Sequence, residues 1–190
     1  MSMNFELSHL PQRTSKPRNS GFTMVMDKGL SVTECENLVE ASGEYIDIIK
    51  LGFGSSLITP NLDRKLAFFK EAGIPVYFGG TLLEAFIVRG QFDDYLRLMD
   101  RYKMEYAEVS DGSITMPHPE KLHYIHRLSK RLTVISEVGS KEEGILIRPN
   151  KWIEMMNTEL EAGSWKVIAE ARESGTVRIY RPNGKAHAVL

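Results

Sequence analysis

Six stretches rich in Val, Ile, Leu, Phe and Tyr each run directly into charged or glycine residues. They span residues 22–27, 45–50, 75–80, 106–111, 132–137 and 165–170. A short apolar run that ends in charge is typical of a buried strand in a parallel sheet, because helices cover its middle and its C-terminal end reaches solvent or a ligand. Folds built from βα units place their chemistry at those strand ends. The pattern therefore predicts an α/β fold with a site at one shared edge.

Helical patterns fill the intervals between the predicted strands. They span residues 31–42, 62–72, 82–90, 92–102, 119–130 and 145–162. The first opens with Ser31 and carries Glu34 three residues later, which is the signature of a capping box. The fifth carries Leu122, Ile125 and Leu128 at helical spacing. Strands and helices that alternate in this way predict right-handed βαβ units and a parallel sheet.

The number of strands leaves two architectures open. A closed (β/α)8 barrel has eight strands and about 250 residues, whereas this chain has 190 residues. One interpretation is an open, doubly wound sheet. The other is a fold of the (β/α)8 TIM-barrel type that lacks its last two βα units in this chain. In the barrel interpretation, residues 1–20 form a basic N-terminal arm, residues 21–175 a βα-barrel domain and residues 176–190 a divergent tail.

Composition excludes several classes of protein. The formal net charge of -1 gives no overall field that would attract nucleic acid or anionic lipid. No apolar stretch approaches the roughly 20 residues needed to span a bilayer, and the polar N-terminus lacks the apolar region of a secretory signal. A single cysteine, Cys35, cannot form an internal disulfide. We therefore expect a cytoplasmic protein with no membrane and no nucleic-acid partner.

Polar residues at the ends of the predicted strands are the candidates for chemistry. They are Asp27, Lys50, Gly79, Gly80, Glu84, Glu108, Ser110, Asp111, Glu137, Lys141, Glu170 and Arg172. Carboxylate oxygens suit Mg²⁺, and lysine and arginine suit a phosphate or carboxylate substrate. A desolvated lysine can also have a lowered pKa, which fits it for proton transfer. Together these residues predict a cup that binds an anionic substrate and magnesium.

Structural roles stay open for individual residues in this set. An acid at a strand end can cap a helix or pair with a nearby lysine. Asp47 could face either the interior or the helix layer, because it alternates with isoleucines. Gly79 and Gly80 could form a plain turn or let the backbone approach a ligand. The basic segment 13–18 could be a solvated arm or could close one end of the cup.

Seven motifs follow one another along the chain, at residues 13–18, 26–29, 45–56, 78–84, 108–113, 136–141 and 170–175. In this order they resemble a known family, that of phosphosulfolactate synthase, which begins one route to coenzyme M. The resemblance implies a (β/α)8 barrel, Mg²⁺ and the addition of sulfite to phosphoenolpyruvate. In that reaction the sulfite sulfur attacks the terminal methylene carbon, charge moves into the carboxylate, and a proton is delivered to the neighbouring carbon.

The resemblance also suggests roles for the candidate residues. Lys141 is the expected general acid, and Glu137 and Arg172 are the other catalytic candidates. The candidates for binding substrate are Lys50, Gly79, Gly80, Ser110 and Arg172. The candidates for holding metal are Asp27, Glu108 and Glu170, although the sequence fixes no coordination geometry. We expect small-molecule substrates, phosphoenolpyruvate and sulfite, and a homo-oligomer.

The chain departs from the family pattern after residues 170–175. Family members continue with strands seven and eight, which often contribute phosphate sites in such barrels, and their absence would expose two strand edges. We therefore expect a fragment, edges covered by partner chains, or lost activity. The leading function is a carbon–sulfur lyase that forms (2R)-O-phospho-3-sulfolactate. The alternatives are a non-catalytic, stress-associated protein on the same scaffold, and a barrel lyase or aldolase with a Schiff-base lysine at Lys50 or Lys141.

Overall fold

A computed structural model of the chain describes residues 5, 7–139 and 148–170. Six strands form within these ranges: β1 (Met24–Asp27), β2 (Ile48–Leu51), β3 (Val76–Phe78), β4 (Tyr106–Val109), β5 (Thr133–Val138) and β6 (Ser164–Ala169). Each strand overlaps one of the six apolar runs, so the predicted strands are confirmed.

Helices connect these strands, as the alternating pattern predicts. They are α1 (Val32–Ser42), α2 (Leu62–Glu71), α3 (Gly80–Ile87), α4 (Phe92–Arg101), α5 (His118–Ser129) and α6 (Pro149–Glu161), with the 3₁₀ turns η1 (Gly43–Tyr45) and η2 (Gly52–Leu57). The predicted capping box begins α1. The Ser31 hydroxyl accepts from the Glu34 N–H, and the Glu34 carboxylate accepts from the Ser31 N–H.

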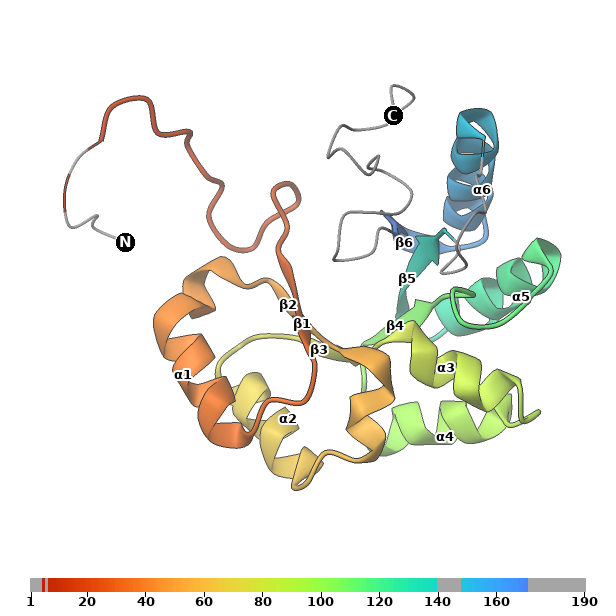
Figure 1. The fold of residues 1–190 in the computed structure, drawn as a ribbon, viewed down its shortest axis with the longest axis horizontal. Helices are drawn as coiled ribbons and strands as arrows, with labels where there is room; N and C mark the ends of the chain where they lie inside the picture. The colour runs from red at the N-terminus through yellow and green to blue at the C-terminus, as the bar shows by residue number, and fades with distance from the viewer. Residues whose placement is uncertain (1–4, 6, 140–147, 171–190) are drawn as a thin grey trace.

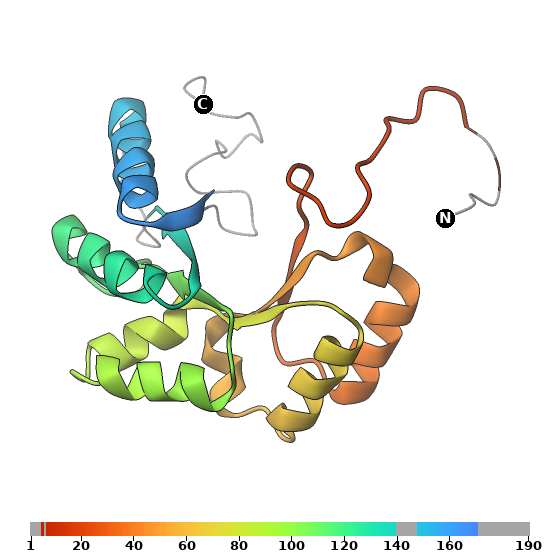
Figure 2. The ribbon, with the colours of Figure 1, turned by 180° about the vertical axis from the view of Figure 1, so that it is seen from behind.

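All strand pairs are parallel and form two three-stranded sheets, β1-β2-β3 and β4-β5-β6. Strands β3 and β4 are in contact, but no backbone ladder joins them within the described ranges. The helices form an arc outside the strands (Figure 1), and the view from behind shows the same arrangement (Figure 2). The α/β class with parallel sheets is confirmed, whereas the residues described here form neither a closed barrel nor one continuous sheet.

The two faces of the strands have different neighbours. Residues such as Ile49 and Leu51 pack with helix residues in a large outer core. Ile48, Tyr77 and Ile135 form a smaller inner cluster that is built from strand residues and their immediate flanks. Helices therefore cover one face of the strands in the described part of the chain. A doubly wound sheet would carry helices on both faces, so the described strands do not have that arrangement.

The inner face changes from apolar to charged toward the carboxyl ends of the strands. Side chains two positions apart on a strand point to the same side. Three such pairs have an apolar or aromatic residue followed by a charged one: Ile48 and Lys50, Tyr106 and Glu108, and Ile135 and Glu137. The charged members consequently form a layer above the inner apolar cluster.

The N-terminal arm binds the opposite end of the strands. The Arg18 guanidinium lies 2.6 Å from an Asp47 oxygen, and the Thr23 N–H donates to the second Asp47 oxygen at 2.7 Å. Arg13 donates to Thr23 and to the Tyr45 carbonyl. These contacts lie at the amino ends of β1 and β2, so the arm does not close the end of the cup that holds Lys50.

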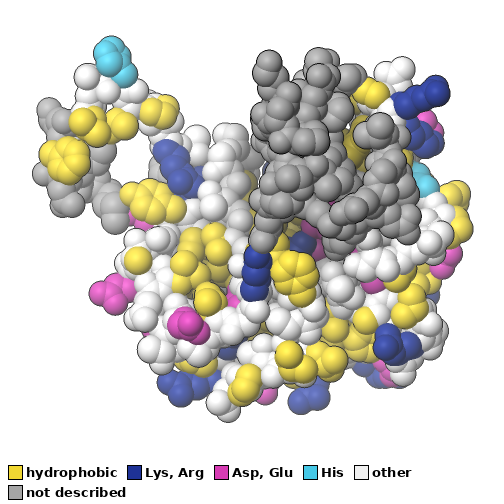
Figure 3. Space-filling model, in the orientation of Figure 1, with side chains coloured by type: hydrophobic (Ala, Val, Ile, Leu, Met, Phe, Trp, Pro, Cys, Tyr) yellow, Lys and Arg dark blue, Asp and Glu magenta, His cyan; other side chains and the backbone are white. Residues whose placement is uncertain are grey.

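No described helix has the length and apolar character to cross a bilayer. Acidic and basic side chains are interspersed on the face shown in Figure 3.

Candidate active site

Lys50 lies at the centre of the inner charged layer. Its ammonium nitrogen is 2.7 Å from Glu108 Oε1 and 2.6 Å from Glu137 Oε1, and all three side chains are at most one-tenth exposed. Lys50 comes from β2, Glu108 from β4 and Glu137 from β5. The ion pairs therefore cross the interior and join one three-stranded sheet to the other. We call these three residues and Tyr77 the Lys50 cluster.

Glu108 has two further partners besides Lys50. The Tyr77 hydroxyl donates to Glu108 Oε2 at 2.8 Å, and the Gly80 N–H donates to Oε1 at 2.6 Å. These contacts fasten the end of β4 to β3 and to the first residue of α3. Both carboxylate oxygens of Glu108 thus accept hydrogen bonds from buried donors.

The two glycines after β3 are required by close approach within this cluster. A Cβ atom on Gly79 would lie 3.0 Å from Lys50 Cε, and a Cβ on Gly80 would overlap the Ser110 side chain and lie 3.1 Å from Glu108 Oε1. Gly79 and Gly80 therefore bring backbone next to the charged residues of the site. The structure thus shows that this backbone comes close to protein side chains, and its approach to a ligand stays a prediction.

The charges within the cluster set its protonation states. Burial alone lowers the pKa of Lys50, but the Glu108 and Glu137 carboxylates outweigh it and hold the pKa above its ordinary value. Burial, and after it the Glu137 charge, raises the pKa of Glu108 despite the neighbouring Lys50. Burial also raises the pKa of Tyr77. Lys50 is thus a cation at neutral pH, and the raised pKa of Glu108 favours the protonated form of that carboxyl group.

Ser110 lies beside the cluster but is bound to a second buried acid. Its hydroxyl donates to Glu84 of α3, and the Ser113 N–H donates to the other Glu84 oxygen at 2.8 Å. Both Ser110 and Glu84 are about 1% exposed. Glu84 therefore fixes the loop after β4, and the Ser110 hydroxyl is occupied by a protein partner in this conformation.

Asp27 lies on the other face of the strands. Its Oδ1 accepts from the Gly29 and Leu30 N–H groups at 2.7 and 2.8 Å, and its Oδ2 lies 2.6 Å from the Lys65 ammonium of α2. In the strand register Asp27 aligns with Leu51, a residue of the outer core, whereas Met26 aligns with Lys50. The structure thus does not bring Asp27 together with Glu108 and Glu137.

Cys35 of α1 borders the same outer region. It is fully buried and unpaired, with its sulfur 4.0 Å from an Asp27 oxygen. Burial raises the pKa of the thiol to about 11. A thiol in this environment is unreactive at neutral pH.

The remaining site residues lie at the margin of the described ranges or beyond them. Glu170 directly follows β6, and its N–H donates to the Val138 carbonyl at 2.9 Å. Lys141 and Arg172 lie outside the described residues, so the general acid and the arginine stay predictions.

A Mg²⁺ site needs carboxylate oxygens that converge on the ion, which also keeps waters and substrate oxygens. Asp27 and Glu108 use their oxygens for protein donors and lie on opposite faces. No group of three His, Cys, Asp or Glu within the described ranges could hold a metal ion. Asp27 and Glu108 therefore do not fit a shared magnesium site, and the metal stays a prediction.

Three buried charged side chains on helices were not predicted from the sequence. They are Lys65 on α2, Lys121 on α5 and Glu159 on α6, each at most 1% exposed. Lys65 is followed four residues later by buried Phe69, and Lys121 by buried Ile125. A charge at helical spacing from core residues was the signal that could have identified the two lysines.

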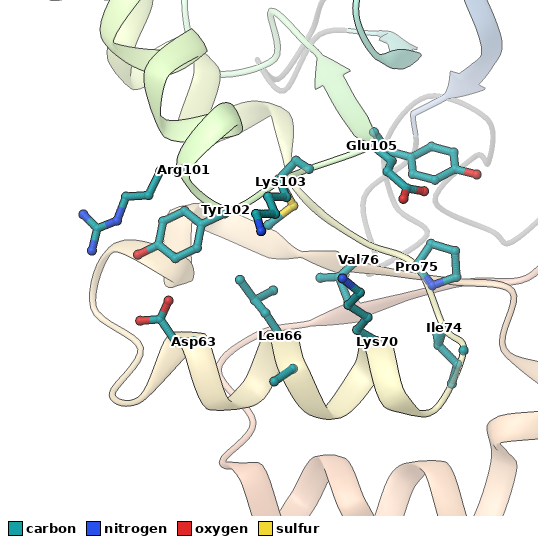
Figure 4. A pocket seen from close by; sticks show the side chains of 14 residues that line it. Asp63, Leu66, Lys70, Ile74, Pro75, Val76, Arg101, Tyr102, Lys103 and Glu105 are labelled. Atoms are coloured by element: carbon teal, nitrogen blue, oxygen red, sulfur yellow. The ribbon is translucent and has the colours of Figure 1, made fainter.

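A groove of ≈ 610 Å³ opens at a different place, at the amino ends of β3 and β4. Its walls come from α2 and from the segment that joins α4 to β4, and its lining includes Lys70, Lys103 and Val76 (Figure 4). None of the Lys50 cluster lines it. The groove is therefore separate from the candidate active site.

Comparisons with known proteins identify similar chains. The family model described as (2R)-phospho-3-sulfolactate synthase (ComA) matches residues 11–190. A phosphosulfolactate synthase of Bacillus subtilis (strain 168) is 38% identical over 184 residues, which cover 96% of this chain and 73% of the relative. Those of Methanothermobacter thermautotrophicus and Methanocaldococcus jannaschii are 32% and 34% identical, over 92% and 87% of this chain and 70% and 68% of their own lengths.

Proposed function

Because the chain belongs to the phosphosulfolactate synthase family, we propose that it is a carbon–sulfur lyase acting in the synthase direction. It adds sulfite to phosphoenolpyruvate and forms (2R)-O-phospho-3-sulfolactate. The Lys50 cluster carries this proposal, because a buried lysine and two carboxylates from three strands converge at the carboxyl ends of those strands. That is the end at which barrel enzymes hold their substrates.

The reaction makes clear demands on the site. A new bond forms between sulfur and the methylene carbon, and the π electrons of the double bond move toward the carboxylate. The neighbouring carbon then takes a proton, which completes the balance. Both substrates are anions, and negative charge builds on the carboxylate during the addition. A fixed cation near that carboxylate stabilises the transition state more than the ground state.

Lys50 fits the role of that fixed cation. Its raised pKa keeps the ammonium charged, and contacts with Glu108 and Glu137 hold it in one position. We propose that Lys50 binds the substrate carboxylate and that Glu137 orients Lys50. The Gly80 N–H and Tyr77 hydroxyl keep Glu108 in place. Lys141 remains the proposed general acid, and Arg172 the proposed ligand of the substrate phosphate.

The closed barrel and the Mg²⁺ dependence that the family implies are also part of the proposal. The single helical layer and the charged inner layer support a (β/α)8 barrel, in which the described βα units form one part of the wall. We keep Mg²⁺ dependence as a prediction, with Glu170 as the predicted ligand still to be tested. Loss of synthesis in a chelator, with recovery on adding Mg²⁺, would support it.

The alternatives differ in what they require of Lys50. A Schiff-base aldolase needs a neutral lysine, and the two carboxylates that raise the pKa of Lys50 disfavour that state. A non-catalytic protein on the same scaffold would need no positioned cation in the interior.

The experiment is formation of phosphosulfolactate from phosphoenolpyruvate and sulfite by the purified chain. Phosphorus NMR separates the product from the substrate, and the Bacillus subtilis relative serves as the positive control. We expect product that depends on sulfite and on Lys50. A folded chain that forms none, while the relative does so under the same conditions, would reject the proposal and favour the non-catalytic alternative.

A further inference from the structure

Lys121 of α5 is completely buried, and its ammonium nitrogen lies against three oxygen atoms. It donates hydrogen bonds to Asp111 Oδ1 at 3.0 Å and to the main-chain carbonyl of Glu137. Its third partner is Glu159 Oε1, which forms an ion pair with it at 2.8 Å. A buried lysine ammonium needs such partners, because it carries three N–H donors and a charge.

These acceptors lie on separate elements of the fold. Asp111 follows β4 and is next to Ser110, Glu137 belongs to β5, and Glu159 belongs to α6. Within the described residues, His118 at the start of α5 also contacts this group, with Nε2 3.3 Å from Glu159 Oε1. One ammonium thus ties the ends of two neighbouring strands to the two helices that cover them.

The contact with Glu137 connects Lys121 to the Lys50 cluster. Lys121 holds the main chain of Glu137 from the helix side, while the Glu137 carboxylate points to the inner face and lies 2.6 Å from Lys50. Within the described residues, neither Lys121 nor Glu159 forms an ion pair with Lys50. The most direct path from Lys121 to Lys50 therefore runs through Glu137.

Stability alone does not account for these buried charges. Replacing a buried ion pair with apolar residues of similar volume is often neutral or stabilising. Lys121 lies one turn before buried Ile125 and two turns before buried Leu128, on a face where an apolar residue would pack well. What an apolar residue could not supply is a directed hydrogen bond to the Glu137 carbonyl.

We propose that Lys121 is a positioning residue, which fixes the main chain of Glu137 so that its carboxylate holds Lys50 in place for the reaction. The activity readout rests on the proposed function, whereas the stability readout below does not. Small displacements of a catalytic group lower rates strongly, and about 1 Å can cost on the order of 100-fold.

The test uses a variant that removes both buried charges together. Lys121→Met alone takes the lysine from buried Glu159, which keeps only its 3.3 Å contact with His118, and we expect it to lower the melting temperature by about 10 °C. The double variant K121M/E159L removes the fully buried carboxylate as well and leaves only Asp111, whose side chain is 16% exposed, without its lysine. It should therefore melt within about 5 °C of the natural chain. The matched control is R18M/D47N, which removes a buried ion pair at the opposite end of the strands.

Kinetics give the first readout. K121M/E159L should lose about 10- to 100-fold in kcat, with a smaller change in KM for phosphoenolpyruvate. R18M/D47N should stay within about twofold of the natural chain, because distant sites act independently. An unchanged kcat in K121M/E159L would overturn the catalytic role of this positioning.

A double-mutant cycle gives a readout that needs no activity. Lys50→Met is introduced into the natural chain, into K121M/E159L and into R18M/D47N, and melting temperatures are compared. If Lys121 places Glu137 against Lys50, Lys50→Met lowers the melting temperature by less in K121M/E159L than in the other two. Equal losses in all three would overturn the proposal. If the natural chain makes no phosphosulfolactate, the proposed function fails, and this cycle alone decides whether Lys121 positions Glu137.

Discussion

Removing the Lys50 ammonium tests how the cluster is held together. Lys50→Met keeps an unbranched side chain, one heavy atom shorter, but leaves the Glu108 and Glu137 carboxylates facing each other across the interior. Those side chains are only 1% and 7% exposed and lie 2.7 and 2.6 Å from the ammonium. Removing one partner of a buried ion pair costs about 3–5 kcal/mol. We expect a loss of this size in the free energy of unfolding at pH 8.

The loss should be smaller at low pH. The pKa of Glu108 is already raised by burial and by Glu137, and without Lys50 it rises further. A carboxyl group whose pKa is higher in the folded state stabilises the fold at low pH, and this stabilisation disappears as the pH rises through that folded pKa. Lys50→Met should therefore be less damaging at pH 5 than at pH 8.

Urea denaturation at the two pH values measures this effect. The matched control is Lys151→Met on α6, which breaks an exposed ion pair with Glu154 at 2.7 Å. Exposed pairs contribute at most about 1 kcal/mol, so this variant should stay close to the natural chain at both pH values. A Lys50→Met loss no larger than that of the control, or one independent of pH, would refute our account of the cluster.

Three further predictions concern individual residues. Gly80→Ala should reduce synthesis and stability together, because its Cβ overlaps Ser110; activity assays and urea denaturation should both show the loss. Cys35 should react with a thiol reagent at pH 8 far more slowly in the folded than in the unfolded chain, since burial raises its pKa to about 11; equal rates would contradict this. Ser31→Ala should lower the free energy of unfolding by about 1 kcal/mol through loss of the α1 cap, as urea denaturation would show.

Most of the fold could be predicted because strand and helix patterns are local. The six apolar runs identified the strands, and Ser31 with Glu34 identified the start of α1. The lack of a backbone hydrogen-bond ladder between β3 and β4 in the described ranges could not be predicted in the same way. Sequence periodicity does not report which neighbouring strands form hydrogen bonds.

The sequence predicted the candidate site correctly only for residues that lie on the inner face of their strand. Lys50, Glu108 and Glu137 each follow an inner residue at an interval of two, so they share a face. Asp27 directly follows Met26, which aligns with Lys50, and therefore points to the outer face. This difference depends on the register between strands, and a single sequence does not contain that register.

The helix charges were missed for another reason. Lys121 and Lys65 lie beside buried apolar positions, where a long polar side chain is usually expected to reach solvent. Their acceptors, Glu137 on β5 and Asp27 on β1, come from distant parts of the sequence. Only the packing of the helices against the strand ends shows why these charges are buried.

We propose that sulfite and phosphoenolpyruvate react at the Lys50 cluster. The most direct test of this claim is the rate of phosphosulfolactate formation, measured by phosphorus NMR, for the natural chain, Lys151→Met and Lys50→Met at equal folded concentration. We predict similar rates for the first two and a rate at least about 100-fold lower for Lys50→Met. A Lys50→Met chain that forms product as fast as Lys151→Met would contradict the claim.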